Sequence, residues 1–390
     1  MKNYSFKNVR NIYVCGGLGC DLKRFLNSIK SNLNVKPEDA DATHPMELEK
    51  RERQSRRVGP SVSMSMLKKL DGFLSHDFSN SLYLITGDCG FGFNSQKYYE
   101  DFLSKRNKIF SYNNVYVVFV RGNHDDPEYF DGDRVDYSNI KAVPDYSIVE
   151  ACGKKILCVG GAISVDRKWR IEQEERINKF ETQAKKHLYW PNEAPILNID
   201  LLNEISKSNK IDYVVSHSAP SFINHSNVCT KEWAEKDSSI IDDVNRERLI
   251  MDKIYETLRD NNNRPQYWAY GHFHFWNLEK RSGTIFRSLA DDFSPISVER
   301  DINSIESAEQ KATPKKKIRK FNYIPNPIAE ENVLEVDEPM RDIDEINDEE
   351  GDVRADDILL ERPAPGEPYA NGGFVDMVFD LAATNNVIRG

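Results

Sequence analysis

The chain has 390 residues, which suits one large domain or two ordinary ones, and 39% of them are hydrophobic, enough to bury a sizeable core. The first residues, MKNYSFKNVRN, hold no apolar stretch, and no apolar run approaches about 18 residues, so the sequence predicts neither a signal peptide nor a membrane span. The six cysteines are scattered without a C-x-x-C pair, which favours reduced thiols in a cytoplasmic compartment over a disulfide framework.

Strand-like and helix-like segments alternate through about residue 300. The run IYVC (12–15) leads into DLKRFLNSIKSN (21–32), where Leu22, Phe25, Leu26 and Ile29 fall on one helical face. Further strands are predicted at SLYLIT (81–86), VYVVFV (115–120), KILCVGG (155–161), DYVVSH (212–217) and QYWAYGH (266–272), and a helix at 246–260. This order predicts an α/β body.

Two charged regions interrupt or follow that body, and we expect a domain over 1–300 and a tail over 301–390. Residues 35–65 form a polar insertion with the charge run EKRERQSRR, interpreted as solvated, with a contact to a phosphate backbone or an acidic partner as the alternative. The tail begins after residue 300 as a linker, SIESAEQKATPKKKIRK (304–320), which ends in a basic run. Residues 330–361 follow with fifteen Asp or Glu against two Arg, a local net charge of −13, and are predicted to be mostly disordered. The last segment, 372–390, turns apolar again and is expected to dock on the body or on a partner.

Four polar clusters stand immediately after predicted strands. They are GDCGFGFN (87–94), RGNHDD (121–126), SHSAP (216–220) and GHFHF (271–275). Ligands of open α/β sheets collect outside the carboxyl ends of the strands, so segments far apart in sequence are expected at one rim. The side chains predicted to meet there are Asp88, Asn123, His124, His217, His272 and His274.

These residue types suit a metal centre. A carboxylate bridges two cations, while imidazoles and an amide oxygen complete the shells, and such a mixed nitrogen and oxygen set suits Mn, Fe, Zn or Ni. Two divalent ions clamp a phosphoryl group and turn a bound water into the nucleophile. A histidine outside the shell then protonates the leaving oxygen.

These motifs, in this order, resemble those of the calcineurin-like metallophosphoesterase family, over about Asn11 to Phe293. The segments VGGAISVDRKWR (159–170) and YWPNEAP (189–195) are similar to a subgroup of bacterial and phage members. The resemblance implies two mixed β-sheets packed as a sandwich with flanking helices. It also implies hydrolysis of a phosphomonoester or phosphodiester by a metal-bound water, in a bacterial or phage-infected host cytoplasm.

The family's first motif, Asp-x-His after the first strand, is replaced here by Gly17-Leu18-Gly19. The resemblance implies that one ion keeps its full set of ligands, and that the other keeps only Asp88 and His274. It implies His124 as proton donor, with Asp125 beside it to orient the ring. The implied ligands of the intact position are Asp88, Asn123, His217 and His272.

Two arginines in SVDRKWR, Arg167 and Arg170, are candidate phosphate contacts because the guanidinium fork matches phosphate oxygens. A salt-bridged loop is the alternative interpretation of both.

Three interpretations of the altered first motif stay open. The first is a phosphoesterase with one firmly held ion and a second recruited by substrate. The second is rescue of the depleted position by Asp21, Cys20 or water. The third is a catalytically inactive protein that binds a phosphate-containing ligand or serves in assembly, viral assembly included. A protein partner is expected at the insertion or the tail, and nucleic acid stays open as a ligand.

Overall fold

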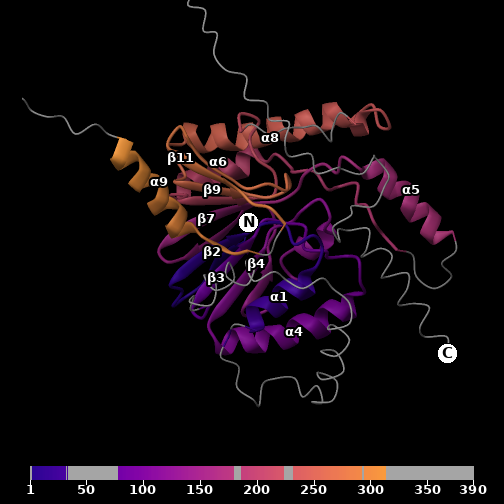
Figure 1. Cartoon of the computed structure of the whole chain (residues 1–390), viewed down its shortest axis with the longest axis horizontal. Coiled ribbons are helices and arrows are strands. Elements are labelled where there is room, and N and C mark those ends of the chain that lie inside the picture. The colour runs from indigo at the N-terminus through magenta and orange to yellow at the C-terminus, as the bar shows by residue number, and fades with distance from the viewer. Residues whose placement is uncertain are drawn as a thin grey trace, which may run out of the picture.

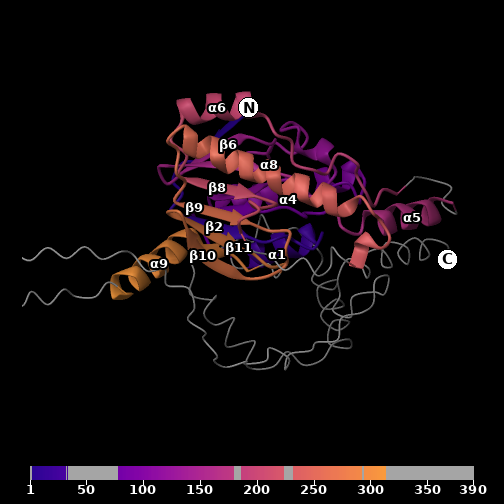
Figure 2. The ribbon, with the colours of Figure 1, turned by 90° about the horizontal axis from the view of Figure 1, so that it is seen from above.

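The computed structural model describes residues 2–31, 33, 78–179, 186–223, 232–291 and 294–312. The predicted insertion at 35–65 and all of the tail beyond residue 312 lie outside these residues. Helices and strands are arranged in four layers, with α6 and α8 on one side of two sheets and α1 and α4 on the other (Figure 1). Figure 2, seen from above, shows α8 running across β8 and β9.

The larger sheet has seven strands in the order β1-β6-β7-β8-β9-β11-β10, and the smaller has five in the order β12-β2-β3-β4-β5. Both are mixed, because β6–β7, β10–β11 and β12–β2 pair antiparallel and the other pairs are parallel. The predicted sandwich of two mixed sheets is confirmed. The strands are β1 (Asn3–Ser5), β2 (Asn11–Cys15), β3 (Ser81–Ile85), β4 (Val115–Phe119), β5 (Ile140–Ala142), β6 (Ser147–Ala151), β7 (Lys154–Val159), β8 (Tyr213–Ser216), β9 (Tyr267–Tyr270), β10 (Asn277–Arg281), β11 (Thr284–Ser288) and β12 (Ile296–Ser297).

Alternation along the strands divides the core into layers. In β3, which is buried on both faces, Leu82 and Leu84 pack between the two sheets, whereas Tyr83 and Ile85 face the layer of α1 and α4. The helices are α1 (Leu22–Ser31), α4 (Gln96–Tyr112), the 3-10 turn η1 (Pro127–Phe130), α5 (Arg167–Asn178), α6 (Ile199–Ser208), α8 (Ile240–Asp260) and α9 (Val298–Ala312). The four predicted apolar positions of α1 are all buried. None of the helices in the described ranges combines the length and apolarity that crossing a bilayer requires.

The end of the body differs from the sequence prediction. The predicted linker begins after residue 300, but residues 298–312 form α9, which packs against β2. Val298 and Ile302 are buried in the core between the sheets. Their apolar spacing over one helical turn is masked in the sequence by the charged residues around them.

Candidate metal centre

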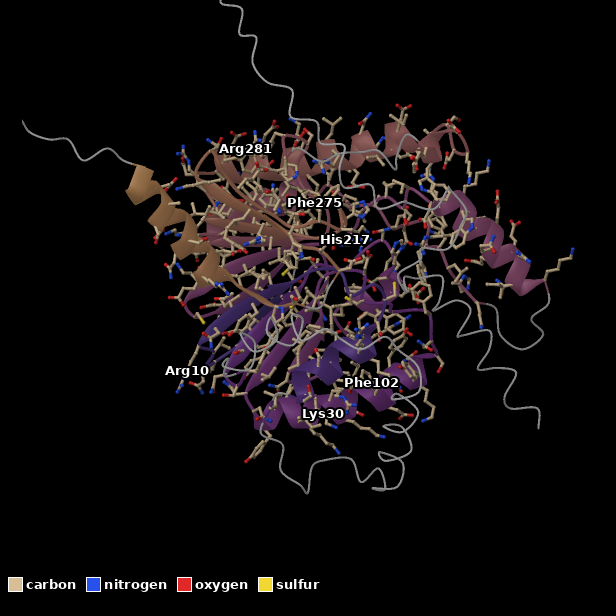
Figure 3. The ribbon with its side chains drawn as sticks, viewed as in Figure 1. Arg10, Lys30, Phe102, His217, Phe275 and Arg281 are labelled. Carbon is tan, nitrogen blue, oxygen red and sulfur yellow. The ribbon has the colours of Figure 1, made fainter. Side chains whose placement is uncertain are left out.

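The loops after β3, β4, β8 and β9 meet where the two sheets approach each other, and the labelled His217 lies near the middle of this view in Figure 3. Three of the predicted site residues have left-handed backbone: Asp88 at φ 52°, His272 at φ 67° and His274 at φ 55°. Side-chain-bearing residues rarely adopt this region, and such positions cluster at functional sites. Gly87 permits the approach, because a Cβ there would lie 2.3 Å from Nδ1 of His217.

Four predicted ligands converge on one point. Nε2 of His217 lies 2.7 Å from Oδ1 of Asn123 and 3.4 Å from Oδ1 of Asp88. Nδ1 of His272 lies 3.1 Å from the same Asn123 oxygen. Two atoms that bind one ion at about 2.1 Å are themselves about 3.0–3.4 Å apart. Two of the three separations fall in this range, and the His217–Asn123 separation is shorter by about 0.3 Å. All four members except His272 are buried.

The protonation of His217 strengthens the fit. Its Nδ1 lies 2.5 Å from the carbonyl oxygen of Thr86, and since a carbonyl only accepts, Nδ1 carries the proton. The other ring nitrogen, Nε2, is thereby directed at the amide oxygen of Asn123, the orientation of an imidazole that ligates a metal through Nε2. The arrangement suits a divalent ion held by two imidazoles, an amide oxygen and a carboxylate.

Within the described residues, His, Cys, Asp and Glu side chains alone form no group of three or more that could hold a metal ion. Asp88, His217 and His272 come together around the amide of Asn123, and an Asn is not counted in a group of that kind.

The orientation of Asn123 comes from two residues that sequence reasoning missed. Nδ2 of Asn123 donates to Oγ of Ser164 at 2.8 Å, and Ser164 donates to a carboxylate oxygen of Glu193 at 2.5 Å. This chain of donors aims the amide oxygen of Asn123 at the imidazoles. Ser164 and Glu193 lie in the segments 159–170 and 189–195, which resemble the bacterial and phage subgroup. A lone Ser and a lone Glu, however, give no pattern that predicts their contact with Asn123. Burial raises the pKa of Glu193 to about 8, against the effect of the Ser164 bonds.

His124 lies beside this set but is oriented by other residues than predicted. Nη2 of Arg170 lies 3.0 Å from its Nε2, and Nδ2 of Asn123 lies 3.3 Å from either ring nitrogen. Burial, and then the charge of Arg170, lowers the pKa of His124 well below its ordinary value, so the ring is neutral. Its backbone N–H donates to Oδ1 of Asp88 at 3.1 Å.

Asp125, predicted to orient the His124 ring, instead holds loop backbones together. Its two carboxylate oxygens accept from the backbone N–H groups of Gly90, Phe91 and Gly122 at 2.8–3.1 Å. Burial, and then the charge of Asp88, raises the pKa of Asp125 to about 6. The backbone donors consume its accepting capacity, which is the physical reason for the difference from the expectation.

The two candidate phosphate contacts separate in the structure. Arg170 is buried beside His124 and pairs through Nε with Asp166 at 2.8 Å. Arg167 binds Asp237 at 2.7 Å and Asp243 at 2.8 Å, so it joins α5 to the start of α8 and does not join the converging set. The salt-bridged alternative describes Arg167.

The Gly17–Cys20 loop has a scaffolding contact. The backbone N–H groups of Leu18 and Cys20 donate to the carbonyl oxygen of Asp88 at 3.2 and 3.0 Å, which helps to hold Asp88 in its left-handed conformation. Asp21, one candidate for rescue, accepts from the backbone N–H of Arg24 and caps α1. Burial, and then the charge of Asp88, raises the pKa of the Cys20 thiol well above its ordinary value, which opposes a thiolate ligand.

His274 stands apart from the set around Asn123. Its Nδ1 forms an ion pair with Oδ2 of Asp291, a residue that follows β11 and that sequence reasoning missed. The His274 side chain is 57% exposed, so desolvation lowers its pKa little in practice. The bond to Asp291 and the charges of Asp291 and Asp88 raise the pKa of His274 to about 9.

Comparison with known proteins agrees with this architecture. The family model described as calcineurin-like phosphoesterase matches residues 64–275, from before Asp88 through Phe275, and the Gly17 loop lies outside the match. A solved structure of phosphopantetheinyl hydrolase (PptH) from Mycobacterium tuberculosis is similar at 13% identity and a TM-score of 0.25, over 63% of this chain and 88% of that one. At this TM-score it supports no inference about function. No curated protein matches the chain. Because the family model covers more than half of its length, the chain belongs to the calcineurin-like phosphoesterase family.

Proposed function

We propose that this protein is a metal-dependent phosphoesterase that hydrolyses a phosphomonoester or phosphodiester. The single observation that carries the proposal is the convergence of His217 and His272 on the amide oxygen of Asn123, with Asp88 beside them. These four residues would hold the ion, and Mn, Fe, Zn or Ni suits them. When bound, the ion supplies positive charge for a phosphoryl oxygen and lowers the pKa of a coordinated water.

The protein's own residues would place the substrate and move the proton. Of the two candidate arginines, only Arg170 lies beside His124 in the described contacts. Its guanidinium would bind a phosphoryl oxygen. His124 would protonate the leaving group. Because burial and Arg170 keep the ring neutral, His124 must first gain a proton, and a phosphate that pairs with Arg170 would favour that gain.

A specific observation also favours a second candidate function. Gly17 and Gly19 supply no ligand, so the first metal position is depleted. A protein that binds a phosphate-containing ligand without turnover would keep the same fold and the same four ligands. The insertion at 35–65 or the tail would then bind the partner.

Hydrolysis of bis-p-nitrophenyl phosphate in Mn²⁺ separates the two. We expect turnover by the wild-type chain and a loss of about 10²–10⁴-fold in His124→Ala, the usual contribution of a general acid. The matched control is His187→Ala, because His187 is exposed and pairs only with Glu174 in the described contacts. Background rates in all three proteins would contradict the phosphoesterase proposal and favour ligand binding without turnover.

A further inference from the structure

Helix α8 runs across β8 and β9 (Figure 2), and its residue Glu247 is buried. One carboxylate oxygen of Glu247 accepts from the backbone N–H of Ile163 at 2.6 Å, in the loop after β7. The other oxygen accepts from the hydroxyl of Ser218, in the loop after β8. A single side chain of α8 therefore joins two loops that follow neighbouring strands of the larger sheet.

On the side of β8, Glu247 acts on His217. Ser218 follows His217 directly in the chain, and both are fully buried. The bond from Ser218 to Glu247 holds the backbone from which the imidazole extends. The ring itself is held at Nδ1 by the carbonyl oxygen of Thr86, at 2.5 Å. Without Glu247 the ring would keep this second contact, but the backbone that carries it would be free to shift.

On the side of β7, Glu247 acts on Asn123 through one residue more. Ile163, whose N–H it binds, precedes Ser164, and the hydroxyl of Ser164 accepts from Nδ2 of Asn123 at 2.8 Å. Glu247 therefore anchors the loop that orients the Asn123 amide. The same carboxylate thus lies behind both residues of the shortest contact in the candidate site, the 2.7 Å between Nε2 of His217 and Oδ1 of Asn123.

A carboxyl group is an unusual choice for this position of the helix. Other buried residues on the same face of α8 are apolar, among them Val244, Met251 and Ile254. Burying a carboxyl group costs free energy unless donors meet it, and the two loops supply those donors. An apolar residue would serve the packing of helix on sheet, whereas Glu247 also fixes the distance between two loops.

We propose that Glu247 is a positioning residue of the metal site, which sets the separation of His217 and Asn123 and thereby the affinity for the ion. It acts through Ser218 and Ser164 and is not itself one of the proposed ligands. This inference rests on the proposed metal dependence of the site, and a measurement on the metal-free chain tests the placement of His217 separately.

The first measurement is nuclear magnetic resonance of the full-length chain labelled with nitrogen-15 histidine. The Nδ1–H of His217, bonded to Thr86, should give a ring proton signal protected from exchange with water, and its absence in His217→Gln assigns it. Glu247→Leu fills similar space and offers no acceptor, so we expect this variant to lose the signal to exchange. Glu247→Gln should keep it, because its amide can bond to both loops.

Calorimetry with Mn²⁺ then measures the consequence for the ion. Glu247→Leu should bind Mn²⁺ about 10–100-fold more weakly than the wild type, the usual effect of removing a partner behind a metal ligand. Asp252→Leu is the matched control, because Asp252 lies on the same helix and accepts from the backbone N–H and the hydroxyl of Ser221 at 2.7 and 2.6 Å. It should keep both the Mn²⁺ affinity and the His217 signal.

An unchanged signal and an unchanged affinity in Glu247→Leu would overturn the role of Glu247 and leave the proposed function standing. Equal losses in Glu247→Leu and Asp252→Leu would trace the effect to the general stability of α8 and would overturn it as well. A wild type that binds no Mn²⁺ would contradict the proposed function, and the ring signal would still decide whether Glu247 places His217.

A milder variant covers the case in which Glu247→Leu does not fold. Ser218→Ala removes one of the two bonds and leaves the carboxylate in place. It should weaken Mn²⁺ binding by about 2–10-fold, the equivalent of one hydrogen bond. Wild-type affinity and a protected His217 signal in Ser218→Ala would count against the proposal.

Discussion

Asn123 owes its orientation to side chains that touch none of the other expected ligands. Oγ of Ser164 accepts a hydrogen bond from Nδ2 of Asn123 and donates one to Glu193, which is fully buried. Partners behind a metal ligand fix its geometry and tune its affinity. At the scale of single residues, the site therefore depends on a carboxyl group that lies two hydrogen bonds away from it.

The raised pKa of Glu193 leads us to expect that the stability of the chain depends on pH. The pKa of Glu193 is raised to about 8 in the folded chain from an ordinary value of 4.5, so the native state holds the proton more tightly than the unfolded state. Between these values the unfolded chain has already lost the proton, and the free energy of unfolding falls as the pH rises, by up to about 1.4 kcal/mol per pH unit. Below about pH 4.5 both states hold the proton, so the contribution of Glu193 to stability no longer changes with pH.

Glu193→Gln replaces the neutral carboxyl with a group that cannot ionise. Urea unfolding from pH 5 to pH 8 should show a smaller loss of stability in this variant than in the wild type. Parallel curves for the two proteins would mean that Glu193 is ionised in the native state.

At the scale of elements, α9 is fastened to the larger sheet by one buried carboxylate. Asp301 accepts from Nε of Arg287 on β11 at 2.6 Å and from the hydroxyl of Tyr267 on β9 at 2.7 Å. Apolar residues of the same helix enter the core between the sheets. The helix thus closes the end of the sandwich next to β12 and β2.

Removing Asp301 should destabilise the chain, because Arg287 would keep its charge in a largely buried place without a carboxylate to pair with. We expect Asp301→Ala to lower the free energy of unfolding by about 3–5 kcal/mol. Glu309→Ala, which breaks the pair between Glu309 of the same helix and Lys280 of β10, should cost about 0–1 kcal/mol. Equal losses in the two variants, measured by urea unfolding, would show that the Asp301 cluster does not fasten α9.

At the scale of the whole molecule, the site joins the two sheets. Asp88 and Asn123 follow strands of the smaller sheet, whereas His217 and His272 follow strands of the larger one. An ion bound by all four would link the layers of the sandwich and stabilise only the folded chain. Metal binding and unfolding are therefore expected to be coupled.

The coupling has a calculable size. With free Mn²⁺ at 100 times its dissociation constant, the free energy of unfolding should rise by about 2.7 kcal/mol. The melting temperature should rise with it, and Asn123→Ala should abolish the rise while the surface variant His187→Ala keeps it. A melting temperature that ignores Mn²⁺ in the wild type would argue against a site shared by both sheets.

The sequence predicts those strands and helices in which apolar residues recur with a regular period. Alternation and apolar runs locate the central strands, and the apolar face of α1 is confirmed. The family match supports the fold, but the partners of Asn123 and His274 could not be predicted. Ser164, Glu193 and Asp291 act through position in space, and a single polar residue in a loop shows no period. For the same reason the adjacency of Asp125 to His124 in the sequence predicts a contact between them, whereas the hydrogen bonds of Asp125 lie with the loop backbones.

The close approach of Gly17 to Asp291 also constrains how such a chain changes by mutation. A side chain at position 17 would lie against the carboxylate of Asp291, so the Asp291 side chain would have to rotate away to make room for it. Because Asp291 also pairs with His274, a larger residue at position 17 would disturb that ion pair, and the first loop and the loop after β11 can change only together.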